Sequence, residues 1–275
     1  MGPDAGADRA LGDVRPEDPA ERAAVQIASA AMSGRRWTDK LDAVRRRLER
    51  AAGRDPLRYA DLSRDRQALF ARVQPYTQTS RERVTTLADA VEYVLGAGIP
   101  GDFVECGVWR GGSSMAVALT LLRLGAHDRR LWLYDTFGRM PAPGTRDRDY
   151  AGRGVAGHEA SMLGEAGLSL TEVQAAMRST GFPAEQIRYV PGRVEETIPE
   201  SAPSEIALLR LDTDWYESTR HELEHLYPRL VGGGVLIVDD YGHYAGARQA
   251  VDEYFEGRPI LLARVDYTGR MAVKP

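Results

Sequence analysis

Four carboxylates follow two apolar segments of the sequence, and carboxylates grouped in this way can bind a divalent cation. The segments span 206–211 and 235–238, and one helix-length segment over about 216–230 separates them. Such a strand–helix–strand unit places its strands parallel, with their carboxyl ends at the same edge of the sheet. The side chains expected to meet there are Asp212, Asp214, Asp239 and Asp240. Because like charges repel unless a cation neutralises them, oxygen ligands of this kind predict a Mg²⁺ site.

A simpler role is open for each aspartate taken singly. An aspartate that follows a strand often caps the next helix, because its side chain accepts a hydrogen bond from a free backbone amide. The convergence of four such residues at one edge favours the metal site over capping. The glycines at 232–234 are expected to end the intervening helix before the second strand begins.

A second group of candidate residues surrounds a glycine-rich turn. The segment 102–114 predicts a short strand that turns through Gly107 and two further glycines into a helix. The spacing matches neither the dinucleotide nor the nucleoside-triphosphate fingerprint. Glu105 would repel a phosphate but suits the cationic amine or sulfonium of S-adenosylmethionine. Asp135, which ends the next predicted strand at 131–135, can accept hydrogen bonds from both hydroxyls of an adenosine ribose.

The segment 75–80 comes before a helix that is predicted over 81–95. Ser80 is the expected N-cap of that helix, since its hydroxyl can accept a hydrogen bond from one of the first free amides. Those amides and the hydroxyl groups of 77–80 could instead hold a carboxylate of a bound ligand. The sequence leaves both roles open.

The remaining elements complete a mainly parallel α/β sheet. A third strand is expected over 187–190. The stretch 138–168 is too long for a simple connection and is interpreted as a lid beside the site. Two final strands, at 260–267 and 270–273, are joined through Thr268-Gly269, which is a hairpin signal. The last strand is therefore expected to run antiparallel to the rest.

Composition narrows the class of protein and its partners. The 275 residues carry a net charge of −4 and a pI near 5.8, which argues against a nucleic-acid or acidic-membrane partner. No apolar run reaches the length of a membrane span, and the start of the chain lacks a secretion-signal pattern. The single cysteine, Cys106, fits a reducing compartment. A cytoplasmic location is expected.

The first third of the chain shows helical patterns but no residues arranged for chemistry. We expect a disordered tail over 1–18, a helical extension over 19–74 and one α/β domain over 75–275. The arginine cluster at 45–47 could bind an anionic partner, but a solvated helix face or a subunit contact is the favoured interpretation. The arginine-rich helices thus suggest a homo-oligomer.

Four short motifs lie at the strand ends described above. They are ECGVWRGG at 105–112, DTF at 135–137, LDTDWYEST at 211–219 and DDYG at 239–242. In combination they resemble the macrocin O-methyltransferase family, from about Pro75 to the C-terminus. The resemblance implies a class I methyltransferase fold, a Rossmann-like seven-stranded sheet with an antiparallel last strand. It also implies Mg²⁺-dependent methyl transfer from S-adenosylmethionine to a sugar hydroxyl of a glycosylated natural product.

The resemblance assigns roles to individual residues. The metal ligands that it implies are Asp212, Asp239 and Asp240. Asp214 matches the base, with Asp212 and His243 as the other candidates for catalysis. The expected cofactor-binding residues are Thr77, Thr79, Ser80, Glu105, Gly107, Trp109, Arg110, Ser113, Ser114, Asp135, Thr136, Phe137, Gly192, Arg193 and Asp212. Residues 138–140 depart from the family, which often has an acidic residue after the DTF motif, and this leaves the acceptor open.

Other activities remain to be distinguished. A phenol, catechol or polyketide hydroxyl would suit the same metal site. A non-catalytic protein that binds S-adenosylmethionine is the non-enzyme alternative, but every expected carboxylate and glycine is present. His221 and His225 have a spacing that can bind a metal, yet they are interpreted as part of a solvated helix face. Trp215 is favoured as a wall of the acceptor pocket, where it would stack on a sugar.

Overall fold

The computed structural model describes residues 59–155 and 169–275. The chain divides into two compact units, Met1–Leu62 and Ser63–Pro275, and all that follows concerns the second. The predicted tail at 1–18, the helical patterns between 19 and 52 and the arginine cluster at 45–47 lie outside the described residues.

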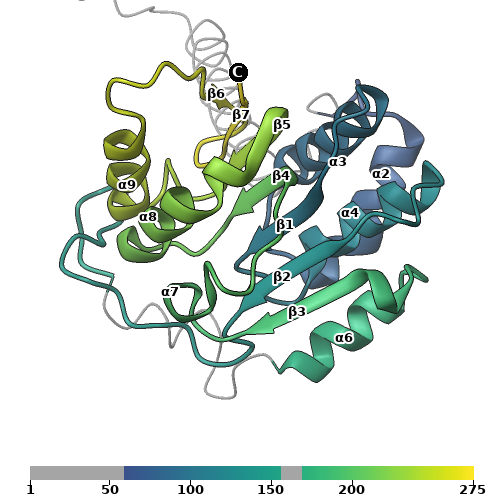
Figure 1. Cartoon of the computed structure of the whole chain (residues 1–275), viewed down its shortest axis with the longest axis horizontal. Coiled ribbons are helices and arrows are strands. Elements are labelled where there is room, and N and C mark those ends of the chain that lie inside the picture. Colours follow the sequence, from purple (N-terminus) through teal and green to yellow (C-terminus); the bar gives the residue numbers. More distant parts are fainter. Residues whose placement is uncertain (1–58, 156–168) are drawn as a thin grey trace, which may run out of the picture. The chain divides into compact units, whose positions relative to one another are not determined.

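The described residues form one seven-stranded sheet, and its order confirms the predicted fold class (Figure 1). The strands are β1 (Asp102–Cys106), β2 (Leu131–Asp135), β3 (Ile187–Pro191), β4 (Ile206–Leu211), β5 (Leu230–Val238), β6 (Ala263–Arg264) and β7 (Arg270–Val273). Their order is β3-β2-β1-β4-β5-β7-β6. The first five run parallel, whereas β7 is antiparallel to both β5 and β6. Chain direction along the sheet reverses between β1 and β4, and open α/β sheets bind ligands at such a point.

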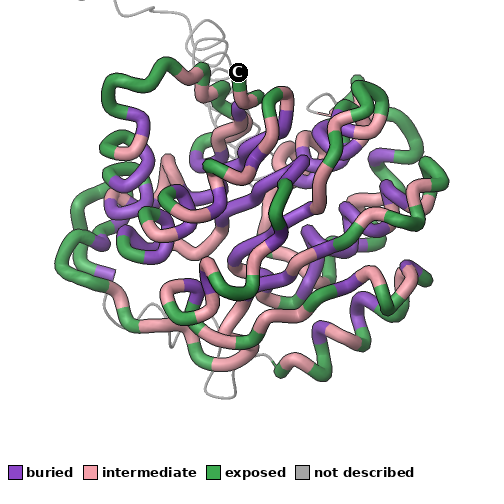
Figure 2. Tube along the Cα trace, in the orientation of Figure 1, coloured by how far each residue is buried: buried purple, intermediate pink, exposed green. Residues whose placement is uncertain are grey.

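Helices cover both faces of the sheet. Figure 1 shows α2, α3, α4 and α6 on one side and α7, α8 and α9 on the other. These helices are α2 (Arg64–Val73), α3 (Arg81–Gly96), α4 (Gly112–Arg123), α6 (Leu170–Arg178), α7 (Val194–Thr197), α8 (Tyr216–His225) and α9 (Ala245–Phe255). Two buried apolar clusters, one on each face, hold the layers together, and the central strands β1 and β4 between them are almost wholly buried (Figure 2). Parallel strands covered on both faces require such continuous apolar runs.

The compact unit that contains the sheet begins at Ser63, before the boundary predicted at residue 75. Ser63 caps α2, and the buried Val73 at its end belongs to the apolar cluster formed with α3 and α4. Arg66 also donates to Asp89 of α3, with Nη2 and Oδ1 2.6 Å apart. Because α2 buries residues against the sheet domain, it is part of that domain.

The predicted cap of α3 is confirmed. Ser80 Oγ accepts a hydrogen bond from the backbone N–H of Arg83 at 3.2 Å. The helix buries one apolar face against the sheet, formed by Val84, Leu87, Ala88, Ala90, Val91 and Val94. This face positions the N-terminus of α3 and the residues just before it.

Two strand boundaries differ from the prediction. The glycines at 232–234 do not separate helix and strand: they lie inside β5, which starts at Leu230. Pro228 in the short 3-10 helix Tyr227–Arg229 ends the helical segment instead, and an irregular register between β4 and β5 accommodates the glycines. The strand predicted over 260–267 is reduced to Ala263–Arg264, since only these residues pair with β7.

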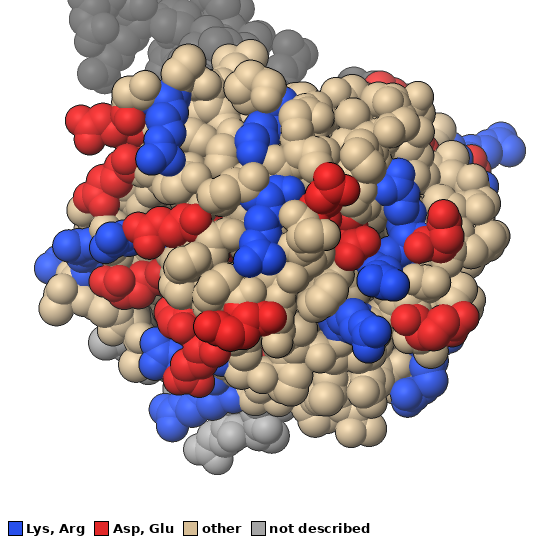
Figure 3. Space-filling model, viewed as in Figure 1, with Lys and Arg blue, Asp and Glu red and all other residues tan. Residues whose placement is uncertain are grey.

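Surface properties of the described residues are those of a globular domain. On the face shown in Figure 3, basic and acidic side chains are interspersed rather than gathered by sign. Within the described ranges, none of the helices combines the length and the apolar composition that spanning a bilayer requires.

Candidate active site

A cavity of about 340 Å³ opens at the carboxyl ends of the parallel strands. Residues that follow β1, β2, β3, β4 and β5 all contribute to its lining, and the turn before β7 closes one side. Its position is the crevice where the direction of the sheet reverses. The size suits a small-molecule ligand.

The glycine turn after β1 is packed against two other parts of the site. Gly107 has φ +83°, and a Cβ there would lie 1.9 Å from the carbonyl oxygen of Asp212. A Cβ on Gly112 would lie 2.5 Å from the carbonyl oxygen of Tyr76. Glycine is therefore required at both positions for close packing, and at Gly107 also for backbone conformation. These contacts bring the loop, the segment before α3 and the end of β4 together.

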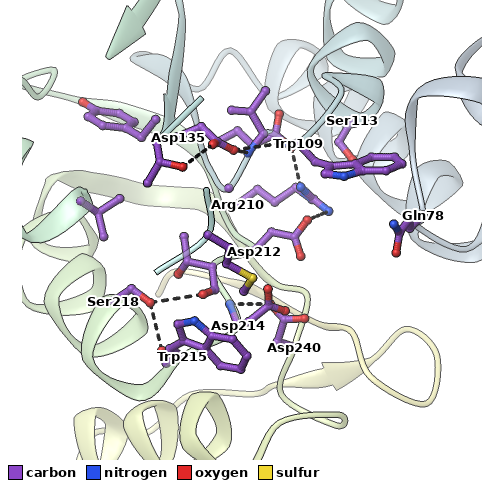
Figure 4. A pocket seen from close by; sticks show the side chains of 18 of the residues that line it. Gln78, Trp109, Ser113, Asp135, Arg210, Asp212, Asp214, Trp215, Ser218 and Asp240 are labelled. Atoms are coloured by element: carbon purple, nitrogen blue, oxygen red, sulfur yellow. Dashed lines mark hydrogen bonds and ion pairs between the residues drawn. The ribbon is translucent and has the colours of Figure 1, made fainter. Parts of the chain in front are cut away.

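Asp135 holds this loop in place from the end of β2. Its Oδ2 accepts hydrogen bonds from the backbone N–H groups of Val108 at 2.7 Å and Trp109 at 2.9 Å. Its Oδ1 accepts one from Phe137 N–H at 2.8 Å. Asp135 still lines the cavity (Figure 4). Asp135 therefore fixes the turn, and it also lies at the position predicted to bind a ribose.

Glu105 is buried and already has a cationic partner within the chain. Its Oε1 accepts a hydrogen bond from Arg210 Nη1 at 2.5 Å, and its Oε2 accepts one from Ser114 Oγ. Burial raises the pKa of Glu105 to about 7, although the Arg210 charge opposes that rise. The cation that this carboxylate was predicted to meet is therefore, in this structure, an arginine of β4.

Arg210 also joins two of the predicted metal ligands. Its Nη2 donates to Asp212 Oδ2 at 2.7 Å (Figure 4). It also donates to Asp239 Oδ2 at 2.7 Å. The same nitrogen lies 3.2 Å from Thr79 Oγ1. A second guanidinium, that of Arg83 on α3, forms an ion pair with Asp239 Oδ2. The predicted convergence of carboxylates is present, and two arginines neutralise part of its charge.

The other half of the acidic group consists of Asp214 and Asp240. Asp214 adopts φ +66°, and its backbone N–H donates to Asp240 Oδ2 at 3.2 Å. Removal from water raises the pKa of both carboxyl groups, and the charge of Asp212 raises them further. Such a cluster favours either a shared proton or a bound cation.

Asp239 offers an oxygen suited to a cation. Its Oδ2 is held by both arginines, whereas its buried Oδ1 has no hydrogen-bond partner among the described residues. In the ranges 59–155 and 169–275 no three His, Cys, Asp or Glu side chains already form a metal-ligand set. The donor chemistry thus fits a hard divalent ion, and the Mg²⁺ site stays a prediction.

Another part of the cavity lining, here called the aromatic wall, is largely apolar and aromatic. It contains Met140, Pro141, Trp215, His243 and Tyr267. Trp215 Nε1 donates to the carbonyl oxygen of Pro141 at 2.9 Å, and Tyr267 Oη lies 3.1 Å from His243 Nδ1. This wall is built from the first part of the predicted lid, the start of α8, the segment between β5 and α9, and the turn before β7.

Most of the predicted site residues line the cavity. They are Thr77, Thr79, Glu105, Gly107, Trp109, Ser113, Asp135, Thr136, Gly192, Arg193, Asp212, Asp214, Asp240 and His243. Five predicted residues do not line it, namely Ser80, Arg110, Ser114, Phe137 and Asp239.

These five residues have other surroundings. Ser80 caps α3, and Ser114 bonds Glu105 beneath the loop. Arg110 stacks over the Trp109 ring on the surface, and Phe137 packs edge-on against Tyr189. Asp239 lies behind the lining, fully buried. His221 and His225, which were interpreted as solvated, are half-buried and lie outside the lining; His221 Nε2 is 2.9 Å from the Ile198 carbonyl.

The sequence interpretation missed the two arginines. Arg210 had a detectable signal, because it is a charged residue within the apolar run 206–211 of a strand that must be buried on both faces. A buried arginine in such a strand requires carboxylate partners. Arg83 lies on α3 among other charged residues and carried no comparable signal.

Comparison with known proteins relates this geometry to a family. Residues 29–272 match the Macrocin-O-methyltransferase (TylF) family. The 8-demethyl-8-(2,3-dimethoxy-alpha-L-rhamnosyl)-tetracenomycin-C 4'-O-methyltransferase of Streptomyces olivaceus is 40% identical over 70% of this chain and 74% of its own length. The demethyldecarbamoylnovobiocin O-methyltransferase of Streptomyces niveus is 37% identical over 65% of this chain and 67% of its own.

The solved structures agree with the sequence relatives. The structure of the O-methyltransferase NovP is 34% identical, covers 72% of this chain and 82% of its own, and superimposes with a TM-score of 0.66. A calicheamicin methyltransferase, CalS11, shares the fold at 21% identity and a TM-score of 0.52. The resemblance inferred from the four motifs is confirmed: the chain belongs to the macrocin O-methyltransferase (TylF) family of methyltransferases.

Proposed function

We propose that this chain transfers a methyl group from S-adenosylmethionine to a hydroxyl group of a glycosylated natural product, with Mg²⁺ bound at the acidic group. The observation that carries the proposal is the cavity itself. The glycine turn and Asp135 form one end, and Asp212, Asp214 and Asp240 lie beside them. One ligand space therefore joins a nucleoside-binding turn to a cluster of carboxylates.

The cofactor would occupy the end formed by β1 and β2. Gly107 lets the backbone approach a ligand closely, and Asp135 stands where acidic residues bind ribose hydroxyls in open α/β sheets. Thr77, Gln78 and Thr79 line the cavity next to the turn, just before the N-terminus of α3. They suit the polar methionine part of the cofactor, because hydroxyl, amide and backbone groups can hold a carboxylate.

The acidic group fits the metal that the family resemblance implies. Asp212, Asp240 and the unpartnered Oδ1 of Asp239 would hold the ion. A bound Mg²⁺ would stabilise negative charge that develops on the acceptor oxygen. Asp239 is held rigidly by its arginine contacts, which supports its use as a ligand.

Asp214 is the base that the geometry favours. It lines the cavity two residues beyond Asp212, and its backbone is fixed by the hydrogen bond to Asp240. Burial raises the pKa of the Asp214 carboxyl towards neutral pH. A general base works best when its pKa lies near the pH at which the enzyme operates. His243 also lines the cavity, where it contacts Tyr267.

The acceptor would lie against the aromatic wall. Trp215 and Tyr267 offer apolar faces of the kind on which sugar rings stack, and Met140 and Pro141 extend that surface. The names of the relatives describe methyltransferases of a rhamnosyl-tetracenomycin, of demethyldecarbamoylnovobiocin and of mycinamicin III. These names support a glycosylated antibiotic-like acceptor. The cytoplasmic location and homo-oligomeric state inferred from the sequence remain predictions.

The test is calorimetric titration of the purified full chain with S-adenosylmethionine, S-adenosylhomocysteine and NAD⁺, each with and without Mg²⁺. We expect micromolar binding of both adenosyl ligands and none of NAD⁺. Absence of adenosyl binding would overturn the cofactor assignment. Turnover of glycosylated acceptors that persists in EDTA, in both the wild type and Asp240→Asn, would overturn the metal assignment. Methylation of phenols but not of sugars would overturn the acceptor class.

A further inference from the structure

The two oxygens of the Asp239 carboxylate have different surroundings. Oδ2 accepts from Arg210 Nη2 at 2.7 Å and pairs with Arg83 Nη1. Oδ1 is buried and has no hydrogen-bond partner in the part of the chain that the structure describes. Two guanidinium groups on one oxygen restrict rotation of the carboxylate, so the free oxygen keeps a fixed direction.

Arg83 is itself held from its other side. Its Nε donates to Asp266 Oδ2 at 3.1 Å. The exposed fractions of the two side chains are only 14% and 9%, so water competes little with this pair. The Asp266 oxygen also accepts a hydrogen bond from Ser80 Oγ at 2.7 Å. Asp266 thus contacts both Ser80, the N-cap of α3, and Arg83 in the first turn of that helix.

Asp266 is fixed by the turn before β7. Its Oδ1 accepts hydrogen bonds from the backbone N–H groups of Thr268 at 2.9 Å and Gly269 at 2.7 Å. Thr268 Oγ1 in turn donates to the backbone carbonyl of Asp239 at 2.7 Å. The same turn therefore contacts Asp239 through its backbone and, by way of Asp266 and Arg83, through its side chain.

We propose that Asp266 is a positioning residue of the metal site: it holds Arg83 so that Asp239 keeps Oδ1 free for the cation. This inference rests on the proposed metal dependence. Hydrogen-bonded partners of ligating carboxylates commonly change metal affinity 10- to 100-fold when removed. Asp266 lies 27 residues beyond Asp239 in a hairpin that no metal-binding motif includes.

Two substitutions distinguish this positioning role of Asp266 from a purely structural one. The substitution Asp266→Asn keeps an oxygen that can accept from the two turn amides, but it removes the charge that faces Arg83. Arg83→Lys keeps a charge but lacks the fork that contacts two carboxylates at once. Arg264→Gln is the matched control, since Arg264 is exposed and donates only to the backbone carbonyl of Asp266.

The experiment measures Mn²⁺ binding to the full chain by electron paramagnetic resonance, without acceptor or turnover. We expect one Mn²⁺ per chain with equal Kd in the wild type and Arg264→Gln, and a Kd at least 10-fold higher in Asp266→Asn and Arg83→Lys. In the double variant, Asp266→Asn should add less than 3-fold to the effect of Arg83→Lys, because the two act in series. Affinity for S-adenosylhomocysteine, measured in parallel, should stay within 3-fold and shows that each variant is folded.

The outcomes separate the two proposals. A wild type that binds no Mn²⁺ would remove the proposed metal site itself. A wild type that binds, with an unchanged Kd in Asp266→Asn, would overturn the positioning role alone. Should Asp266→Asn fail to fold, Arg83→Lys decides: an unchanged Kd there also overturns it. Fully multiplicative effects in the double variant would show that Asp266 does not act through Arg83.

Discussion

Gly107 lies so close to Asp212 that a Cβ at position 107 would be 1.9 Å from the Asp212 carbonyl oxygen. The backbone N–H of Asp212 meanwhile donates to the carbonyl of Cys106 at 2.9 Å. The turn that we propose binds the cofactor and the strand end that carries Asp212, a proposed metal ligand, are thus one packed unit. A change in either part must move the other.

Gly107→Ala should therefore abolish cofactor binding. The new methyl group meets backbone rather than a movable side chain, and the residue must also keep φ +83°. Gly125→Ala is the matched control, because Gly125 has φ +74° with no atom within 4 Å of a Cβ. The control should lose about 1–2 kcal/mol of stability and keep its affinity for S-adenosylhomocysteine. Equal calorimetric affinities in both variants would contradict the close-packing argument.

Asp214→Asn should lower kcat about 10²- to 10⁴-fold, the range found when a general base is removed. Asparagine is the right replacement because it tolerates the left-handed backbone that Asp214 adopts. Cofactor affinity should remain within a few-fold, and the exposed Asp128→Asn should behave as the wild type. Steady-state kinetics with an acceptor that carries the free hydroxyl measures this. A kcat within 3-fold of wild type would transfer the role of base to Asp212 or His243.

The buried carboxyl group of Glu222 should make the free energy of unfolding depend on pH. It is fully buried on α8, where it accepts a hydrogen bond from Thr213 Oγ1 at 3.0 Å behind the site. Removal from water raises its pKa well above the ordinary 4.5. The native state therefore keeps a proton that the unfolded chain has lost, so this group makes stability fall as pH rises above 4.5. The slope is at most about 1.4 kcal/mol per pH unit.

Glu222→Gln tests that sign, since glutamine keeps an acceptor for Thr213 but does not titrate. Urea unfolding between pH 5 and 8 should show the wild type losing stability relative to the variant at higher pH. Glu224→Gln, on the exposed face of the same helix, serves as the control. A difference between wild type and Glu222→Gln that grows in the opposite direction would show that Glu222 is charged in the native state.

Sequence patterns predicted what depends on order along the chain. The aspartates after β4 and β5 meet because parallel strands end at one edge, and the antiparallel β7 follows from a short hairpin. The features that could not be predicted are contacts between side chains of helices, strands and turns that are far apart in the sequence. Arg83 and Asp266 are 183 residues apart, and no local period relates them. Position 135 was predicted as a ribose ligand, whereas its two oxygens also hold the turn, which only the folded backbone reveals.

The glycines of β5 illustrate a second limit. Three consecutive glycines, Gly232 among them, are typical of a loop between two elements. Here, however, the residue that follows β7 supplies their hydrogen bonds. Gly233 N–H donates to the carbonyl of Lys274, and Lys274 N–H donates to that of Gly234. Tertiary pairing thus overrides local propensity, which is the usual reason that strand boundaries are misplaced.

Asp147 gives a prediction for acceptor binding. It is buried within the stretch that was interpreted as a lid, and it accepts hydrogen bonds from Tyr216 N–H at 2.9 Å and Gly144 N–H at 2.6 Å. It thereby fastens the part of that stretch that carries Met140 and Pro141 to the start of α8. Asp147→Ala would leave the Tyr216 amide without its partner, which costs about 1–3 kcal/mol.

The expected effect of Asp147→Ala is a higher KM for the acceptor, about 10-fold or more, with the Kd of S-adenosylhomocysteine unchanged. The reason is that Met140 and Pro141 line the wall that we propose binds the acceptor, whereas Asp135 separately holds the turn that we propose binds the cofactor. Asp128→Ala, on the exposed loop before β2, controls for loss of an acidic residue. Equal increases in acceptor KM and cofactor Kd would mean that Asp147 supports the whole cavity and not its acceptor wall.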